Sequence, residues 1–190
     1  KERYDFLISQ TEDLDKAKSD LELLISELTS NMKNIFKAQF SVINENFGKV
    51  FKEFFDGGTG ILKLKDPQDI LNSDIEIEAQ PPGKVIKNIS ALSGGEQSLV
   101  AISLYFAILK VRPTPFCILD EIEAALDDAN VFRYAAYLRK LSQETQFVAI
   151  THRRGTMEEA DVLYGVTMQE KGVSKMLTIN VNDFEKQFKI

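Results

Sequence analysis

The first 55 residues constrain the fold most, because their pattern is compatible with little other than one long helix. They contain no proline, and Gly48 is their only glycine. Apolar residues recur in this segment at a spacing of seven: Leu7, Leu14, Leu21, Leu28 and Ile35. That spacing is typical of a helix with a narrow apolar seam for one partner helix. We therefore predict a coiled-coil helix over residues 1–55.

The second heptad position of this helix is less regular. Tyr4, Ile25 and Met32 occupy it, whereas Thr11 and Lys18 weaken it near the start. An ordinary amphipathic helix packed on its own domain is the alternative interpretation. The chain has no second long heptad segment, so the partner helix would lie elsewhere. After residue 35 the apolar face broadens, as expected of a helix entering a globular core. The residues of this broader face are Phe36, Phe40, Ile43, Phe47, Val50, Phe51 and Phe54.

The remainder of the chain, residues 56–190, has the pattern of an α/β domain. The sequence Asp56-Gly57-Gly58-Thr59-Gly60 ends the long helix. It is interpreted as a turn and not as a phosphate loop, since no Lys-Ser or Lys-Thr pair follows at the needed spacing. The centre alternates strand, helix and strand, which indicates a parallel sheet. The predicted strands are 61–65, 74–79, 116–119, 147–150, 162–168 and 173–181, and the predicted helices are 94–111, 128–141, 156–160 and 183–190.

Composition excludes several classes of protein. The net charge is −6, so the chain lacks a strongly basic footprint for nucleic acid. No apolar run reaches the ~18 residues of a membrane span. The single cysteine, Cys117, lies within an apolar strand and is expected to be a buried, inert thiol. We expect a soluble, cytoplasmic protein with no membrane partner.

A first candidate site begins at Ser93-Gly94-Gly95, directly before an apolar helix. Glycines let the backbone approach a phosphate, and the free amides of a helix start favour an anion. The Ser93 hydroxyl supplies a further donor. The same three residues are also a common helix cap, so the motif alone leaves both interpretations open.

A second candidate site is the pair Asp120-Glu121, which follows the apolar run 116–119. Ligands of open α/β sheets collect at the carboxyl ends of the strands. Adjacent carboxylates point in different directions from an extended backbone, so one can face hydrated Mg²⁺ while the other positions a water molecule. A solvated strand end is the alternative interpretation for an isolated Asp-Glu pair.

Two further elements complete an ordered series. Ala125-Leu126-Asp127 follows the acidic pair, and Thr151-His152 ends the next strand. His152, the only histidine, should therefore lie at the same sheet edge as Asp120 and Glu121. Each element is weak alone, but the series is specific. The phosphate-loop pattern G-x-x-x-x-G-K-[ST] is missing, which suggests half of an ATPase.

The series resembles the motifs of ABC-type ATPases. Leu92 to Glu96 resembles the signature, 116–121 the Walker B strand, 125–127 the D-loop, and 151–153 the switch-histidine loop. The longer run 113–127, with 156–166, is similar to the C-terminal head lobe of bacterial SMC (structural maintenance of chromosomes) proteins. One departure is Glu123, where many relatives have Asp. The implied fold is α/β, the C-terminal half of an SMC- or Rad50-like ATPase head with a long N-terminal coiled-coil helix. Residues 1–55 would be the neck and 56–190 the head lobe.

This resemblance assigns roles to residues, with ATP and Mg²⁺ as the ligands. It implies that Glu121 is the general base and that Asp120 contacts Mg²⁺, through water. It further implies that the signature residues bind the γ-phosphate of ATP held by another head, that Asp127 lies at the head–head interface and that His152 lies near the γ-phosphate. The signature residues are Ser93, Gly94, Gly95 and Glu96.

The resemblance also implies partners and a biological role. The expected partners are the N-terminal SMC head lobe with Walker A, a second SMC head in an ATP-dependent dimer, a kleisin subunit, and DNA through the full complex. The kleisin would bind the neck helix, about 1–50, and the cap strands, about 162–181. The expected role is chromosome condensation and segregation at the bacterial nucleoid. The chain alone should be inactive. Alternatives are half of a Rad50- or RecN-like DNA-repair ATPase, or a catalytically silent kleisin-docking module. A transporter subunit is disfavoured because a heptad helix precedes the signature.

Overall fold

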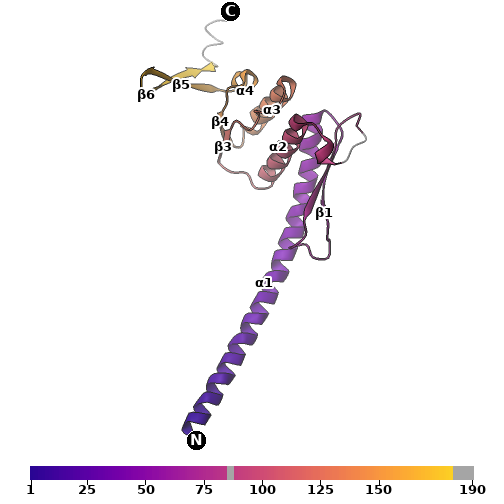
Figure 1. Cartoon of the computed structure of the whole chain (residues 1–190), viewed down its shortest axis with the longest axis vertical. Coiled ribbons are helices and arrows are strands. Elements are labelled where there is room, and N and C mark those ends of the chain that lie inside the picture. The colour runs from indigo at the N-terminus through magenta and orange to yellow at the C-terminus, as the bar shows by residue number, and fades with distance from the viewer. Residues whose placement is uncertain (85–87, 182–190) are drawn as a thin grey trace, which may run out of the picture.

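The computed structural model describes residues 1–84 and 88–181. Figure 1 shows a long helix that ends beside a small α/β head, with a β-hairpin projecting on the far side. The described elements, in chain order, are α1 (Glu2–Phe55), β1 (Thr59–Leu64), β2 (Ile75–Gln80), η1 (Ile89–Ala91), α2 (Gly94–Val111), β3 (Phe116–Asp120), α3 (Asp128–Leu141), β4 (Gln146–Ile150), α4 (Arg154–Glu158), β5 (Val162–Glu170) and β6 (Val173–Asn180). The predicted helix at 183–190 lies outside the described residues.

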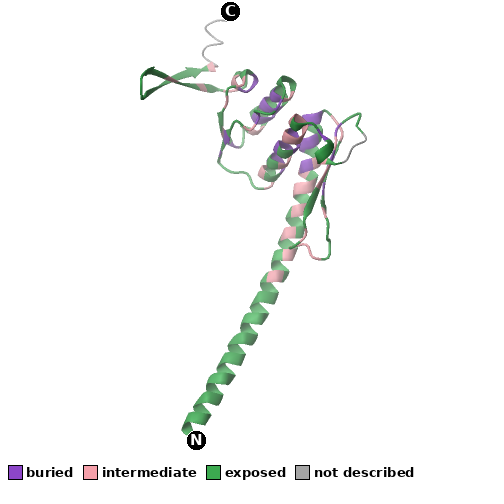
Figure 2. Cartoon of the chain, viewed as in Figure 1, coloured by how far each residue is buried: buried purple, intermediate pink, exposed green. Residues whose placement is uncertain are grey.

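Helix α1 is continuous over 54 residues, in agreement with the predicted helix. Its heptad residues are exposed, from 52% for Leu28 to 71% for Leu14. Figure 2 shows the N-terminal part of α1 as exposed, whereas buried residues occur only in its last turns. The apolar seam is therefore uncovered within the described chain. Asp56 ends the helix in a left-handed conformation, with φ 56°.

The core forms where the broad apolar face of α1 meets the head. Phe47, Phe51 and Phe54 of α1 are fully buried. The ring of Phe54 lies 4.9 Å from that of Tyr137 in α3 and 6.1 Å from that of Phe106 in α2. Burial of such rings is strongly favourable, so these aromatic contacts fix the end of α1 to the head.

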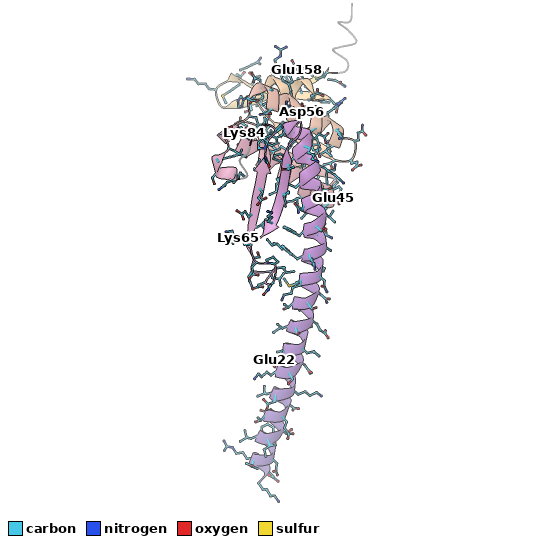
Figure 3. All side chains as sticks on the ribbon, turned by 90° about the vertical axis from the view of Figure 1, so that its right-hand side faces the viewer. Glu22, Glu45, Asp56, Lys65, Lys84 and Glu158 are labelled. Carbon is cyan, nitrogen blue, oxygen red and sulfur yellow. The ribbon has the colours of Figure 1, made fainter. Side chains whose placement is uncertain are left out.

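A two-stranded antiparallel sheet, β1 with β2, lies along α1 (Figures 1 and 3). The side-chain oxygen of Asn44 accepts a hydrogen bond of 2.7 Å from the Leu62 amide. Gly60 packs against the rings of Phe47 and Phe51, where a Cβ would lie 2.8–2.9 Å from ring carbons. This close approach explains why glycine follows the helix so closely in the sequence.

The strands β3 and β4 pair in parallel, and their register places Asp120 beside Ile150. The predicted strand 116–119 is confirmed, and only one of its faces is covered within the described residues. Cys117 and Leu119 are buried, whereas Phe116 and Ile118 are 59% and 61% exposed. In the described residues, helices α2 and α3 cover one face of the pair, and no element covers the other. The sequence run is apolar throughout, so it could not show which face lacks a cover.

Helix α4 begins at Arg154, two residues before the predicted start, and ends at Glu158. The strands β5 and β6 form an antiparallel hairpin whose residues are mostly exposed. Val166 and Met176 face each other in this hairpin and are 74% and 65% exposed. Among the described helices, none combines the length and apolar character needed to cross a bilayer.

Candidate functional site

The start of α2 is held by local hydrogen bonds. Ser93 is its N-cap residue, and Ser93 and Glu96 form a capping box. The Ser93 amide donates to Glu96 Oε2 at 3.0 Å, and the Ser93 hydroxyl donates to the same oxygen at 2.9 Å. The Glu96 amide donates to Ser93 Oγ at 3.4 Å. These bonds fix the backbone turn that carries Ser93 and the two glycines.

Lys84 is a second partner of Glu96, which the sequence patterns did not indicate. Its Nζ lies 2.7 and 2.8 Å from the two Glu96 carboxylate oxygens. The hydrogen bond from Lys84, followed by that from the Ser93 amide, lowers the pKa of Glu96 below its ordinary value. Glu96 therefore stays ionised, and Lys84 offsets its charge beside a helix start that suits anions.

The two signature glycines have different surroundings. A Cβ on Gly95 would lie 3.1 Å from the Ala125 carbonyl oxygen, so the start of α2 lies against the turn that follows β3. A Cβ on Gly94 would meet nothing within 4 Å. Packing within the chain therefore explains Gly95 but not Gly94. An open approach to the backbone at Gly94 is what a bound phosphate requires.

The acidic pair stands where the sequence predicted it, at the carboxyl end of β3. Asp120 is the last residue of β3 and is exposed. Glu121 adopts φ 47°, one of two positive values among the described residues that are not glycine. Its amide donates to the Ile150 carbonyl at 2.9 Å, which continues the pairing with β4 for one more residue. A non-glycine residue in this region is strained, and such strain is concentrated at functional sites.

His152 meets Glu121 across the two strands, as the sequence predicted for this edge. His152 Nδ1 lies 3.1 Å from Glu121 Oε1, and both side chains are more than half exposed. The carboxylate therefore favours a proton on Nδ1. This arrangement leaves the second carboxylate oxygen of Glu121 and His152 Nε2 without a partner in the hydrogen bonds of the described chain.

Glu123, which sequence reasoning did not include among the site residues, is buried directly behind this pair. It is 1% exposed, and its Oε1 accepts hydrogen bonds from the hydroxyls of Thr151, at 2.5 Å, and Thr156, at 2.9 Å. In the sequence, only its place two residues after the candidate base Glu121 could have pointed to Glu123 as a site residue. Its partners are 28 and 33 residues away.

Asp127 caps helix α3. Its Oδ1 accepts from the Asn130 amide at 2.8 Å, and its Oδ2 accepts from Asn130 Nδ2 at 3.2 Å. The residue is exposed. Asp127 thus has a capping role within the chain, while its contact with another head stays a prediction.

Asp120 is the candidate metal-binding residue of this edge. The exposed carboxylate of Asp120 can accept hydrogen bonds from the water molecules of hydrated Mg²⁺. Within residues 1–84 and 88–181, no three histidine, cysteine, aspartate or glutamate side chains are grouped to hold a metal. Mg²⁺ near Asp120 would therefore take its ligands from phosphate and water, as is usual for this ion.

Comparison with known proteins identifies the family. The family model described as "RecF/RecN/SMC N terminal domain" matches residues 4–175. The chain belongs to this family, and its fold is the α/β head fold of SMC proteins with a long N-terminal helix.

Individual relatives agree with this assignment. The "Chromosome partition protein Smc" of Bacillus subtilis is 57% identical over 182 residues, which cover 96% of this chain and 15% of that protein. The solved Smc head of Pyrococcus furiosus, described with an extended coiled coil and bound to the C-terminal domain of ScpA, is 41% identical with a TM-score of 0.79. That match covers 97% of this chain and 46% of the solved chain.

Another solved structure comes from work on "ATP-driven dimerization and DNA stimulated activation of SMC ATPases". It is 42% identical with a TM-score of 0.74, and the match covers 82% of this chain and 94% of that one. The chain thus spans about one seventh of the length of the first curated relative, where the match covers 15% of that protein.

Proposed function

We propose that this chain supplies the C-terminal half of an ATPase head in a chromosome condensation and segregation SMC protein. In this proposal, residues 1–55 are the neck and 56–190 are the head lobe. An N-terminal lobe bearing Walker A provides the other half, and two such heads engage around ATP. The contact between Glu121 and His152 at the carboxyl edge of β3 and β4 carries the proposal, with Asp120 ending the same strand.

The proposed roles follow from position and chemistry. Glu121 accepts a proton from the attacking water, and His152 orients the Glu121 carboxylate and contacts the γ-phosphate. The Ser93 hydroxyl and the amides of Gly94 and Gly95 bind the γ-phosphate of ATP held by the opposing head. Mg²⁺, bound near Asp120 through water, would neutralise charge on the phosphates.

Two further residues complete the proposed composite site. Glu96 shapes the signature turn through its capping box, and Asp127 lies at the interface between the two heads. The exposed faces of Phe116 and Ile118 in β3 support the need for a second lobe, because such an apolar patch is stabilised by a cover.

We further propose that a kleisin subunit binds the neck helix, about 1–50, and the cap strands, about 162–181. The solved Pyrococcus head bound to a ScpA domain supports a kleisin partner for this chain. The exposed apolar residues of the hairpin, among them Val166 and Met176, offer a surface of suitable chemistry. DNA would be contacted through the full complex, in the bacterial cytoplasm at the nucleoid.

Substitution in the assembled head tests the enzyme proposal. With the complementary lobe supplied, Glu121→Gln should lower ATP turnover by at least ~10²-fold and trap an ATP-dependent dimer. Ser93→Arg should abolish that dimer, because a large cation replaces the phosphate-binding hydroxyl. Glu158→Gln and Ser142→Arg make the same chemical changes at exposed positions elsewhere in the head and should leave both properties unchanged. Dimerisation is followed by light scattering and turnover by phosphate release.

The outcomes separate the alternatives. If neither Glu121→Gln nor Ser93→Arg changes dimerisation or turnover, the enzyme proposal fails and the docking-module alternative is favoured. Binding of a kleisin winged-helix fragment separates the SMC assignment from a Rad50- or RecN-like repair ATPase, for which no binding is expected.

A further inference from the structure

Glu123 holds a buried carboxylate that the proposed reaction does not use. Burying a carboxylate without compensation is costly, so such groups are normally paired with a cation or saturated with donors. Among the ion pairs of residues 1–84 and 88–181, none involves Glu123. Its partners are instead two neutral hydroxyls, those of Thr151 and Thr156.

Glu123 lies in the same turn as the candidate base Glu121, so its hydrogen bonds tie that turn to other residues. The tight turn starts at Glu121, where the Ala124 amide donates to the Glu121 carbonyl at 3.0 Å. The Leu126 amide donates to the Glu123 carbonyl at 2.9 Å. Two backbone hydrogen bonds therefore hold the turn that carries the candidate base, and the Glu123 side chain connects this turn to the neighbouring loop.

Thr151 links the Glu123 side chain to the residues on both sides of His152. Thr151 Oγ1 donates to Glu123 and accepts from the Arg153 amide at 3.0 Å. The residues before and after His152 are thus held by one hydroxyl, and that hydroxyl is held by Glu123. Thr156, which is 6% exposed in α4, holds the same carboxylate oxygen from behind.

We propose that Glu123 is a positioning residue that acts through Thr151 to hold the His152 loop against the Glu121 turn. The inference rests on the proposed function, since it names how the two candidate groups are kept in contact. Glu123 touches neither ATP nor water in this account. Its effect is to keep His152 Nδ1 at the Glu121 carboxylate, where the base is oriented before the reaction begins.

The test uses a pair of variants at Thr151, because truncation of Glu123 would also leave a cavity in the core. Thr151→Val keeps the shape of the side chain and removes the hydroxyl, whereas Thr151→Ser keeps the hydroxyl. In the assembled head, Thr151→Val should lower kcat by about tenfold or more with KM for ATP changed less than about twofold. Thr151→Ser should retain the wild-type kcat.

A second measurement reports the loop itself without turnover. His152 is the only histidine of this chain, so a head assembled from a ¹⁵N-histidine-labelled chain and an unlabelled complementary lobe gives one imidazole signal pair. At pH 9, where a free imidazole is neutral, wild type and Thr151→Ser should show the tautomer with the proton on Nδ1. Thr151→Val should show a mixture of both tautomers.

The proposal requires two results. In Thr151→Val, both kcat and the His152 tautomer must differ from wild type. In Thr151→Ser, both must equal those of wild type. A change in one without the other overturns the proposal, as does equal behaviour of the two variants. If the wild-type head shows no ATP turnover that depends on Glu121, the proposed function fails instead. In that case the tautomer measurement alone decides whether Thr151 holds His152 at Glu121: a mixture in Thr151→Val supports the link and an unchanged Nδ1 proton overturns it.

Discussion

The two halves of the candidate site are built in opposite ways. At the start of α2, Ser93, Glu96 and Lys84 hydrogen-bond to one another within a short stretch of the chain. At the end of β3, Glu121 is held in a left-handed conformation and its carboxylate has only His152 as a partner among the hydrogen bonds of the described chain.

The difference teaches which half needs support from elsewhere in the fold. A capping box is made from residues three apart, so the local sequence is sufficient for it. The strained Glu121 turn depends on contacts between segments about thirty residues apart, such as the 31 residues between Glu121 and His152. Gly95, against the Ala125 carbonyl, joins the two halves.

The largest expected effect comes from breaking that junction. Gly95→Val places a branched side chain where even a Cβ would lie 3.1 Å from the Ala125 oxygen. We expect the free energy of unfolding to fall by about 1–3 kcal/mol, measured by chemical denaturation. Gly94→Ala is the matched control, because space at Gly94 is open, and its stability should stay within about 0.5 kcal/mol of wild type. If both variants lost the same free energy of unfolding, the contact between Gly95 and Ala125 would not be what stabilises this part of the head.

The strain at Glu121 can be isolated by comparing two variants that both lack the carboxylate. Glu121→Gly tolerates φ 47°, whereas Glu121→Ala keeps the unfavourable conformation. Glu121→Gly should therefore be the more stable of the two by about 1 kcal/mol, although neither should hydrolyse ATP. Thermal or chemical unfolding of both proteins checks this order, and the reverse order would show that the turn is not strained.

The two helix caps should behave alike, because each satisfies a free amide locally. Ser93→Ala and Asp127→Ala should each lower stability by about 1 kcal/mol. Asp127→Ala should have the larger effect, since its bond to the Asn130 amide is 2.8 Å and that from the Glu96 amide to Ser93 is 3.4 Å. Ser93→Ala should also weaken ATP-dependent engagement, because its hydroxyl is a proposed phosphate donor, and a stability loss without that defect would assign Ser93 to capping alone.

The smallest effect concerns Lys84 and depends on pH. Because Lys84 lowers the pKa of Glu96 in the folded state, the pair stabilises the protein above the ordinary value of 4.5 and loses this contribution as pH falls through the folded pKa. Lys84→Met should lower stability at pH 7 by about 0.5 kcal/mol. The difference between the two proteins should shrink towards pH 3, and a difference that does not depend on pH would contradict the ionic cause.

The sequence predicted those parts of the site that follow from local rules and strand order. The carboxyl ends of neighbouring parallel strands meet at one edge, which is why the pairing of Glu121 with His152 could be expected. The long helix likewise follows from residue spacing. The family and its fold rest on the motifs between 92 and 153, and the matches to relatives agree.

The rest depends on three-dimensional contacts that the patterns do not encode. Glu123 meets Thr151 and Thr156 only because the β3 turn and the β4 loop lie side by side. Lys84 reaches Glu96 from a loop twelve residues earlier. The start of α4 was misplaced because Arg153 makes no side-chain cap that would mark it. The exposure of Ile118 depends on what covers β3, which its apolar sequence does not specify.

The unbroken α1 has a mechanical consequence. With 54 residues at a rise of ~1.5 Å each, it is a rod of about 80 Å that is anchored at one end by Phe47, Phe51 and Phe54. Each degree by which the head rotates about that anchor displaces the free tip by about 1.4 Å, if the rod stays straight. A rearrangement too small to notice among the head residues would thus be magnified into a swing of many ångströms at the distal end.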